Sequence, residues 1–298
     1  MRRLIILLLI LFPIHHALSQ ERGVVLISEI LFNPPLGGSD YVELYNPGSD
    51  AVDISQLRLA SMKGDSIVKL FAIADRGLLM PHDYLVVTTD AAFVSGNYTV
   101  RYPSKMIEVS KMPSYNDASG IVMVCTIDST VLDRFDYNEK MHSRLLRDRE
   151  GVALERRSFD APTQEASNWY SAASTDGYGT PTYANSQSYE FLFLNGSFHI
   201  EEPLFSPDGD GYSDLLDISF SLENCDMSAN IFIYDAMGRP IRYLSRGVLL
   251  GCSGVVTWDG IDESGRPVPR GKYVVVIEAY NESGAKQSWR RTVSVVRK

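Results

Sequence analysis

The sequence predicts an all-β protein with two Ig-like β-sandwich domains in tandem after a signal peptide. Short β-branched or aromatic runs recur along the 298 residues, and Gly, Pro, Asn, Asp and Ser separate them. Residues 41–45 (YVELY) alternate at period two, as expected for a strand with two different faces. No convincing amphipathic helix occurs, and helical turns are expected only near residues 139–147. This spacing of runs and turns is typical of a sandwich or barrel.

Residues 1–19 are expected to be a signal peptide. Arg2 and Arg3 form a basic start, a short apolar stretch follows, and Ala17 and Ser19 suit cleavage after Ser19. The apolar stretch is too short to span a bilayer. No later segment approaches 18 uninterrupted apolar residues, so no integral membrane segment is expected.

The charge balance argues against two classes of partner. The chain has 28 basic and 37 acidic residues, and loss of the two arginines of the signal peptide leaves a mature net charge of about −11. Nucleic acids and anionic membranes are bound through clustered Lys and Arg, so neither is an expected partner.

The best candidate for a domain boundary is residues 177–188, GYGTPTYANSQS, which have no apolar period. The first domain is therefore expected at residues 20–186 and the second at residues 187–298. A second series of β runs follows the boundary, with the size and rhythm of one Ig-like sandwich.

The first domain resembles the bacterial lamin-tail domain, an Ig-like β-sandwich. The resemblance rests on ISEILFNP, on DYVELYNPGSDAVDISQLRLAS and on the closing SNWYSAASTDGYGTPTYANSQ. The stretch MHSRLLRDREGVALERRSF is similar to a segment typical of these domains in bacteria that use type IX secretion. The resemblance implies an exported protein that acts as a scaffold more often than as a catalyst.

The second domain resembles the Ig-like fold of flagellar hook-capping proteins and the related C-terminal modules of type IX cargo. The matching stretches are FSPDGDGYSD, IFIYDAMGRPIRYL, VTWDGIDESGRPVPRGKY and the final RRTVSVVRK. This resemblance implies that the last strand takes part in sorting, although the same strand would close any Ig-like sandwich. The protein is therefore expected in the periplasm, on the outer-membrane surface or outside the cell.

The cysteines suggest one disulfide. If the strands of the second domain alternate in direction, the loops that hold Cys225 and Cys252 lie at the same end of the sandwich, close enough to be bridged. Cys125 lies within the apolar run GIVMVCTI and is expected to be a small buried core residue.

The stretch FSPDGDGYSD, residues 205–214, crowds carboxylates and glycines just before an apolar run. On the calcium-loop template, Gly211 falls where the chain must turn sharply. The ligands would then be Ser206, Asp208, Asp210, the Tyr212 carbonyl, Asp214 and Asp217. Ser replaces Asp at the first position, a strand follows instead of a helix, and Asp217 is short for a bidentate ligand. A weak, partly hydrated structural Ca²⁺ site is predicted, and the alternative is an acidic turn.

Other polar residues are open to two interpretations. Glu29, Asp40 and Glu43 come from adjacent segments and could converge on a ligand or a cation. Glu43 could instead bind buried main-chain donors of a neighbouring loop, which is the favoured interpretation. His142 is expected to be a hydrogen-bonded loop residue rather than a functional one.

No sequence motif indicates an enzyme. The sequence has no HExxH, G-x-S-x-G or P-loop, and no G-x-G-x-x-G between a strand and a helix. A non-enzymatic surface or envelope scaffold or adhesion protein is therefore predicted, with a protein or glycan of the cell envelope as partner. The alternative is a small secreted hydrolase or its substrate-targeting subunit.

Overall fold

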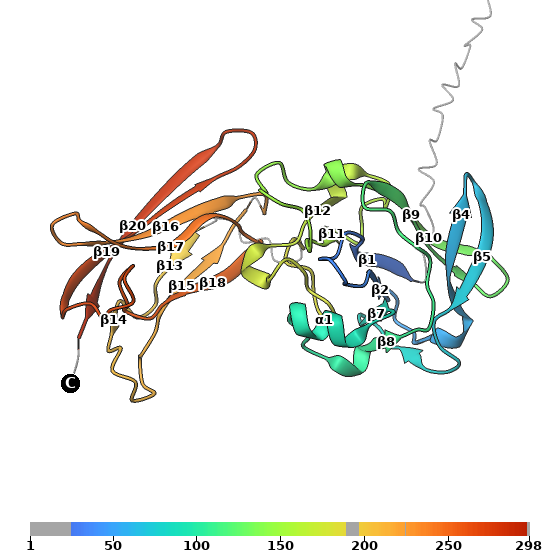
Figure 1. Ribbon diagram of the computed structural model, residues 1–298, viewed down its shortest axis with the longest axis horizontal. Coiled ribbons are helices and arrows are strands. Elements are labelled where there is room, and N and C mark those ends of the chain that lie inside the picture. Colours follow the sequence, from blue (N-terminus) through green and yellow to red (C-terminus); the bar gives the residue numbers. More distant parts are fainter. Residues whose placement is uncertain (1–24, 189–196, 224, 297–298) are drawn as a thin grey trace, which may run out of the picture.

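The computed structural model describes residues 25–188, 197–223 and 225–296, so the expected signal peptide lies outside the described residues. Two strand-rich lobes lie side by side along the longest axis (Figure 1). Each lobe packs two main sheets around its own hydrophobic core. The prediction of an all-β protein with two sandwiches in tandem is confirmed.

The first sandwich packs a six-stranded sheet against a four-stranded one. The larger sheet has the order β12 (Trp169–Ser171), β11 (Leu154–Arg156), β1 (Leu26–Leu31), β2 (Tyr41–Tyr45), β7 (Tyr84–Thr88) and β8 (Met106–Glu108). The smaller sheet has the order β10 (Val131–Asn138), β9 (Ser119–Thr126), β4 (Leu57–Lys63) and β5 (Ser66–Ala72). β3 (Val52–Asp53) and β6 (Leu78–Leu79) form a small separate ribbon.

One short helix is not apparent from the sequence pattern. α1 (Ala91–Asn97) begins after Asp90, whose carboxylate accepts the main-chain N–H of Phe93 at 2.8 Å. It has fewer than two turns and only Val94 is fully buried, so no apolar period reveals it. The other helical elements of the described residues are single 3₁₀ turns: η1 (Ile54–Gln56), η2 (Pro103–Lys105), η3 (Glu139–Met141), η4 (Ala166–Asn168) and η5 (Ser174–Asp176).

The predicted alternation of β2 is present, but both of its faces are buried. Val42 and Leu44 point into the core between the two sheets, where Trp169 stacks on Phe135 with ring centroids 3.6 Å apart. On the opposite face, Tyr41 belongs to a second apolar cluster that packs beneath α1. The outer face of the larger sheet is therefore a second layer of core.

The second sandwich packs a three-stranded sheet against a five-stranded one. The smaller sheet has the order β13 (Ser197–His199), β15 (Leu216–Ser221) and β18 (Ser253–Trp258). The larger has the order β14 (Leu204–Phe205), β20 (Lys286–Val295), β19 (Gly271–Tyr280), β16 (Ser228–Asp235) and β17 (Pro240–Leu249). Trp258 is fully buried between the sheets, against Phe205 and Tyr273.

The predicted disulfide joins Cys225 and Cys252, with Cα atoms 4.3 Å apart. It lies at the end of the second sandwich that faces the first. There the N–H of Cys252 donates to the carbonyl of Ser186 at 2.9 Å, and the Ser174 hydroxyl donates to the carbonyl of Leu249 at 2.6 Å. The disulfide therefore holds a loop that also joins the two sandwiches.

We expect the Cys225→Ser/Cys252→Ser variant to lose about 3.5 kcal/mol of unfolding free energy in the second sandwich, because the bridge closes a loop with a sequence separation of 27. Denaturant unfolding of the full chain measures the effect. Cys125→Ser, which changes the free thiol of the first sandwich, is the control and should leave that transition in place. An unchanged midpoint in the double variant would show that the disulfide contributes nothing to stability.

Candidate functional sites

The acidic loop, residues 206–214, connects β14 to β15 and folds around Asp214. The Asp214 carboxylate accepts main-chain N–H groups of Asp208, Gly209 and Gly211 at 3.1, 2.7 and 2.7 Å. Gly209 and Gly211 have φ values of 79° and 86°, a left-handed conformation that suits glycine. The glycines and Asp214 together therefore set the shape of the loop.

The structure brings together three of the four predicted carboxylate ligands. Asp208, Asp210 and Asp214 each offer an oxygen atom, and these atoms lie within 4.8 Å of one another. The Ser206 hydroxyl donates to Asp208 at 2.9 Å, so it contacts one of the three aspartates. Asp217 lies instead on β15, opposite Thr257 of β18. Hard cations prefer oxygen ligands such as these three carboxylates.

An apolar groove of about 630 Å³ lies beside the acidic loop. Leu204, Phe205 and Val296 line it together with Tyr212 of the loop. Glu201 and Glu202 give the groove an acidic side. The conformation of the loop therefore decides the shape of one groove wall.

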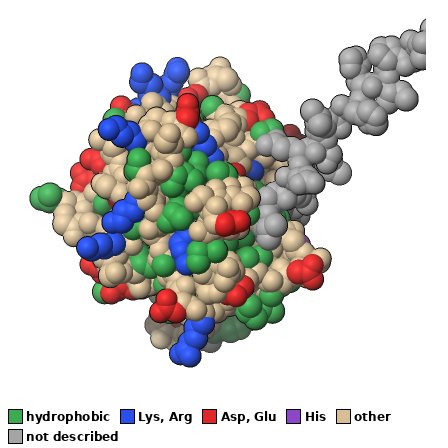
Figure 2. Space-filling view, turned by 90° about the vertical axis from the view of Figure 1, so that its right-hand side faces the viewer, with side chains coloured by type: hydrophobic (Ala, Val, Ile, Leu, Met, Phe, Trp, Pro, Cys, Tyr) green, Lys and Arg blue, Asp and Glu red, His purple; other side chains and the backbone are tan. Residues whose placement is uncertain are grey.

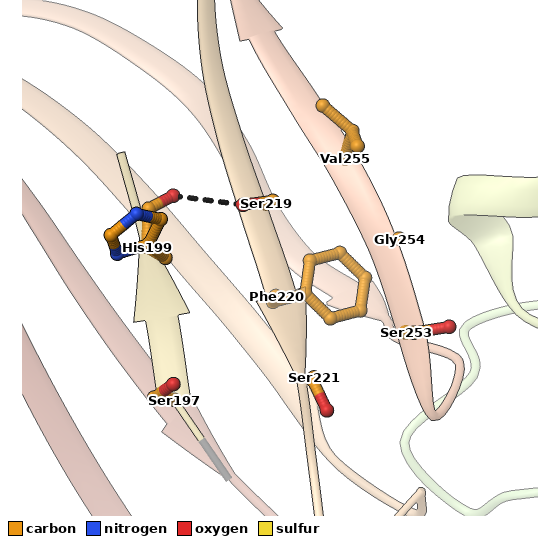
Figure 3. A pocket seen from close by; sticks show the side chains of 8 residues that line it. All are labelled: Ser197, His199, Ser219, Phe220, Ser221, Ser253, Gly254 and Val255. Atoms are coloured by element: carbon orange, nitrogen blue, oxygen red, sulfur yellow. Dashed lines mark hydrogen bonds between the residues drawn. The ribbon is translucent and has the colours of Figure 1, made fainter. Parts of the chain in front are cut away.

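A shallow trough of about 470 Å³ lies on the outer face of the three-stranded sheet (Figure 3). Serines and His199 from β13, β15 and β18 line it, around the ring of Phe220. The Ser219 hydroxyl donates to the main-chain carbonyl of His199 at 3.1 Å, not to its imidazole. The trough therefore lacks the side-chain hydrogen bond between serine and histidine that activates a nucleophile.

A row of three glutamates crosses neighbouring strands on the outer face of the six-stranded sheet of the first sandwich. Glu29 of β1 is paired in register with Glu155 of β11 on one side and with Glu43 of β2 on the other. All three are fully buried. The sequence pattern grouped Glu29 and Glu43 correctly but did not reveal Glu155. It also included Asp40, which lies outside the row and precedes β2.

The glutamate row binds the closing segment, residues 173–188, which covers the row. Each glutamate accepts a main-chain N–H from this segment: Glu29 from Thr180 at 3.0 Å, Glu43 from Thr182 at 2.6 Å and Glu155 from Gln187 at 2.9 Å. Thr182 has a φ of 79°, which is unusual for a β-branched residue. The interpretation of Glu43 as a partner for buried main-chain donors is therefore correct.

The hydrogen bonds within the row require a carboxyl proton. The Thr180 hydroxyl lies 3.0 Å from Glu29 Oε2 and 2.7 Å from Glu155 Oε1, yet it has only one proton to donate. One of the two carboxyl groups must therefore donate to the hydroxyl in return. Burial raises the pKa of Glu29 to about 7 and the pKa of Glu155 to about 8, in agreement with this geometry.

His142 is also buried, directly after η3. Its Nδ1 lies 2.9 Å from the Ser171 hydroxyl, and burial lowers the pKa of the imidazole to about 4. Ser171 Oγ also accepts the main-chain N–H of Ser143 at 2.9 Å. The prediction of a hydrogen-bonded loop residue is therefore confirmed. Cys125 is buried as predicted, but it packs with Ala60 and Met123 on the outer face of the four-stranded sheet and not between the sheets.

Family models match both parts of the chain. Residues 19–139 match the Lamin Tail Domain, and residues 198–292 match the CHU_C type IX secretion signal domain. The chain carries a lamin tail domain followed by a type IX secretion signal domain. Both resemblances seen in the sequence are therefore confirmed. The secretion signal domain marks an exported protein, and no helix in the described part of the chain is long and apolar enough to cross a membrane.

Several solved structures are similar to the chain. FlgD from P. aeruginosa is 23% identical, with a TM-score of 0.23, and the match covers 27% of this chain and 62% of that one. PorZ from Porphyromonas gingivalis is 11% identical (TM-score 0.26; 91% and 39% covered), and PorU from the same organism is 10% identical (TM-score 0.28; 96% and 21% covered). The chain therefore spans less than two thirds of each. No curated protein matches the chain in sequence.

We expect the lamin tail domain to lose stability as the pH rises from 5 to 9. The raised pKa values of Glu29 and Glu155 mean that the folded state holds protons that the unfolded state has released above its ordinary carboxyl pKa. This stabilisation is complete below about pH 4.5 and is lost as the pH passes about 7 and 8.

The melting temperature of the full chain, followed across this pH range, measures the effect. Glu155→Gln should make the profile less steep, because the amide does not titrate while Glu29 still does. Glu165→Gln, at an exposed position of the same domain, is the matched control and should keep the original slope. A melting temperature that stays constant or rises with pH would contradict the conclusion that Glu29 and Glu155 hold protons in the folded state.

Proposed function

We propose that the protein is a non-enzymatic scaffold or adhesion protein of the outer-membrane surface. Residues 20–186 would be the presented module, and residues 187–298 the module that directs its export through type IX secretion. The observation that carries the proposal is the match of residues 198–292 to a type IX secretion signal domain behind a lamin tail domain. A protein or glycan of the cell envelope is the expected partner.

Two structural features support a presenting role. First, the modules contact each other directly: Glu282 of the β19–β20 turn accepts the Ser143 hydroxyl at 2.8 Å and the Arg144 N–H at 2.7 Å. Second, the glutamate row and His142 are buried within structural hydrogen-bond networks, away from any substrate in solution. Side chains with shifted pKa values often mark active sites, but here the glutamates hold the closing segment in place and His142 bonds Ser171.

Surface delivery is tested in a bacterium that has type IX secretion. We expect the tagged full chain to be digested by protease added to intact cells. A variant that lacks residues 189–298 retains the core of the lamin tail domain and should stay protected until the outer membrane is permeabilised. The two forms carry the same tag, so the full chain is the control. Equal digestion of both forms on intact cells would refute a sorting role for the second module.

A calcium ion is the proposed occupant of the acidic loop, held by Asp208, Asp210 and Asp214. The fit rests on three exposed or half-buried aspartates with oxygens within 4.8 Å of one another. Calcium takes roughly six to eight oxygen ligands, so main-chain carbonyls and waters would complete the shell and the site would be weak. The ion would fix the loop and with it the Tyr212 wall of the neighbouring groove.

We expect millimolar Ca²⁺ to raise the melting temperature of the second sandwich relative to EDTA. A site with a Kd on the order of 10⁻⁴ M would contribute about 1.4 kcal/mol under these conditions. Asp210→Asn in the full chain should abolish the difference, whereas Glu223→Gln, at an exposed acid outside the loop, should retain it. Identical melting of the wild type in Ca²⁺ and in EDTA would show that the loop is only an acidic turn.

A further inference from the structure

Polar contacts, and not apolar packing, hold the closing segment on the first sandwich. None of the apolar clusters of the described residues includes a side chain of this segment. The segment is held by the glutamate row and by bonds such as those of the Asn185 amide, which donates to the carbonyls of Ser28 and Arg156 at 2.9 and 2.8 Å. A segment held mainly by hydrogen bonds can open locally while the core beneath it stays folded.

The same segment carries three of the hydrogen bonds that join the two sandwiches. With the donor first, they are Ser174 Oγ to Leu249 O at 2.6 Å, Gln187 Nε2 to Leu250 O at 3.3 Å and Cys252 N to Ser186 O at 2.9 Å. The contact of Glu282 with Ser143 and Arg144 is separate, because it does not involve the closing segment. Displacing the closing segment would therefore break three links between the sandwiches and leave the Glu282 contact in place.

Glu155 connects the row to this junction. Its Oε1 lies 2.7 Å from the Thr180 hydroxyl, and its Oε2 accepts the Ser186 hydroxyl at 2.8 Å and the Gln187 N–H at 2.9 Å. Ser186 and Gln187 also bond to the second sandwich. A change in the charge of Glu155 therefore acts directly on two residues of the junction.

We propose that the carboxyl protons of the glutamate row control the docking of the two sandwiches. When Glu29 and Glu155 are both ionised, the closing segment leaves the row and its three bonds to the second sandwich are lost. The reason is geometric: the Thr180 hydroxyl contacts both carboxyl groups but can donate to only one of them. Two buried like charges without a shared proton are unfavourable, and opening the segment returns them to water.

The groups around Glu29 and Glu155 do not neutralise such charges. The titratable and charged groups that face the two glutamates or their neighbours are Tyr41 and Glu43 of β2, Tyr98 after α1, Asp176 and Tyr183 of the closing segment, and Arg101 before η2. Burial raises the pKa of each tyrosine above its usual range, so all three stay neutral. Asp176 adds a negative charge near Glu29, and Arg101 lies over the ring of Tyr183 at 3.9 Å.

The sign of the effect follows from the two raised carboxyl pKa values, about 7 for Glu29 and about 8 for Glu155. Both groups hold their protons in the docked state at low pH. Docking should therefore be complete near pH 6 and should be lost as the pH rises through about 7 and 8.

Double electron–electron resonance on the mature full chain, residues 20–298, measures this docking. Spin labels at Asp65→Cys and Met237→Cys, whose side chains are 96% and 80% exposed, report from one sandwich each, and Cys125→Ser removes the free thiol. Asp65 lies in the β4–β5 turn, at the end of the molecule that faces the viewer in Figure 2. We expect a narrow distance distribution at pH 6 and at least a doubling of its width at pH 9.

Glu155→Gln is the deciding variant. Its amide can donate to the Thr180 hydroxyl and accept from Ser186 and Gln187, as the protonated acid does, so the distribution should stay narrow at pH 9. Glu165→Gln, at an exposed position of the same domain, is the matched control and should broaden like the wild type.

The emission of Trp169 and Trp258, which are fully buried in the two cores, shows in the same samples whether both sandwiches remain folded. A wild-type width that does not change with pH overturns the proposal. Equal broadening in Glu155→Gln also overturns it, because the row would then not be the controlling group. Broadening together with a red shift of the buried tryptophans overturns it as well, because a whole sandwich would then be unfolding.

Discussion

The structure depends on the contact between the glutamate row and the closing segment. Glu29, Glu43 and Glu155 lie in register across three strands, with no exposed surface on any of them. Carboxylates are not buried in this way unless they are hydrogen-bonded or neutral, and here both conditions apply. Main-chain N–H groups supply the hydrogen bonds, and the Thr180 hydroxyl requires a shared proton. Without the row, the closing segment would lack acceptors for its buried donors.

The same contact determines how the two sandwiches meet. Glu155 accepts the Ser186 hydroxyl at 2.8 Å, and the Ser186 carbonyl accepts the N–H of Cys252 at 2.9 Å. Gly251 lies so close to this carbonyl that an added Cβ would stand 2.7 Å from it. The disulfide to Cys225 fixes the other side of the loop. Two hydrogen bonds through Ser186 therefore connect the buried Glu155 of the first sandwich to Cys252, and so to the disulfide of the second sandwich.

Local patterns in the sequence predicted the features that depend on local chemistry. Period-two alternation identified the strands, and the alternating direction of strands placed Cys225 beside Cys252. Asp208, Asp210 and Asp214 come together because they are close in sequence. Glu155 was missed because its pairing with Glu29 depends on the register of β1 with β11, strands far apart in the chain. The apolar run of β9 was visible, but which side chains face outward depends on the register as well.

The two acidic clusters show that surroundings, and not residue type, decide what a carboxylate does here. The glutamate row is buried away from water, so the charged form of each carboxyl group is unfavourable. Protons and main-chain N–H groups stabilise these carboxyl groups in the way that cations would stabilise exposed carboxylates. The aspartates of the loop lie at the surface, where water stabilises their charge and a cation can reach them. The first cluster therefore strengthens the fold when it takes up protons, and the second can do so only by binding an ion.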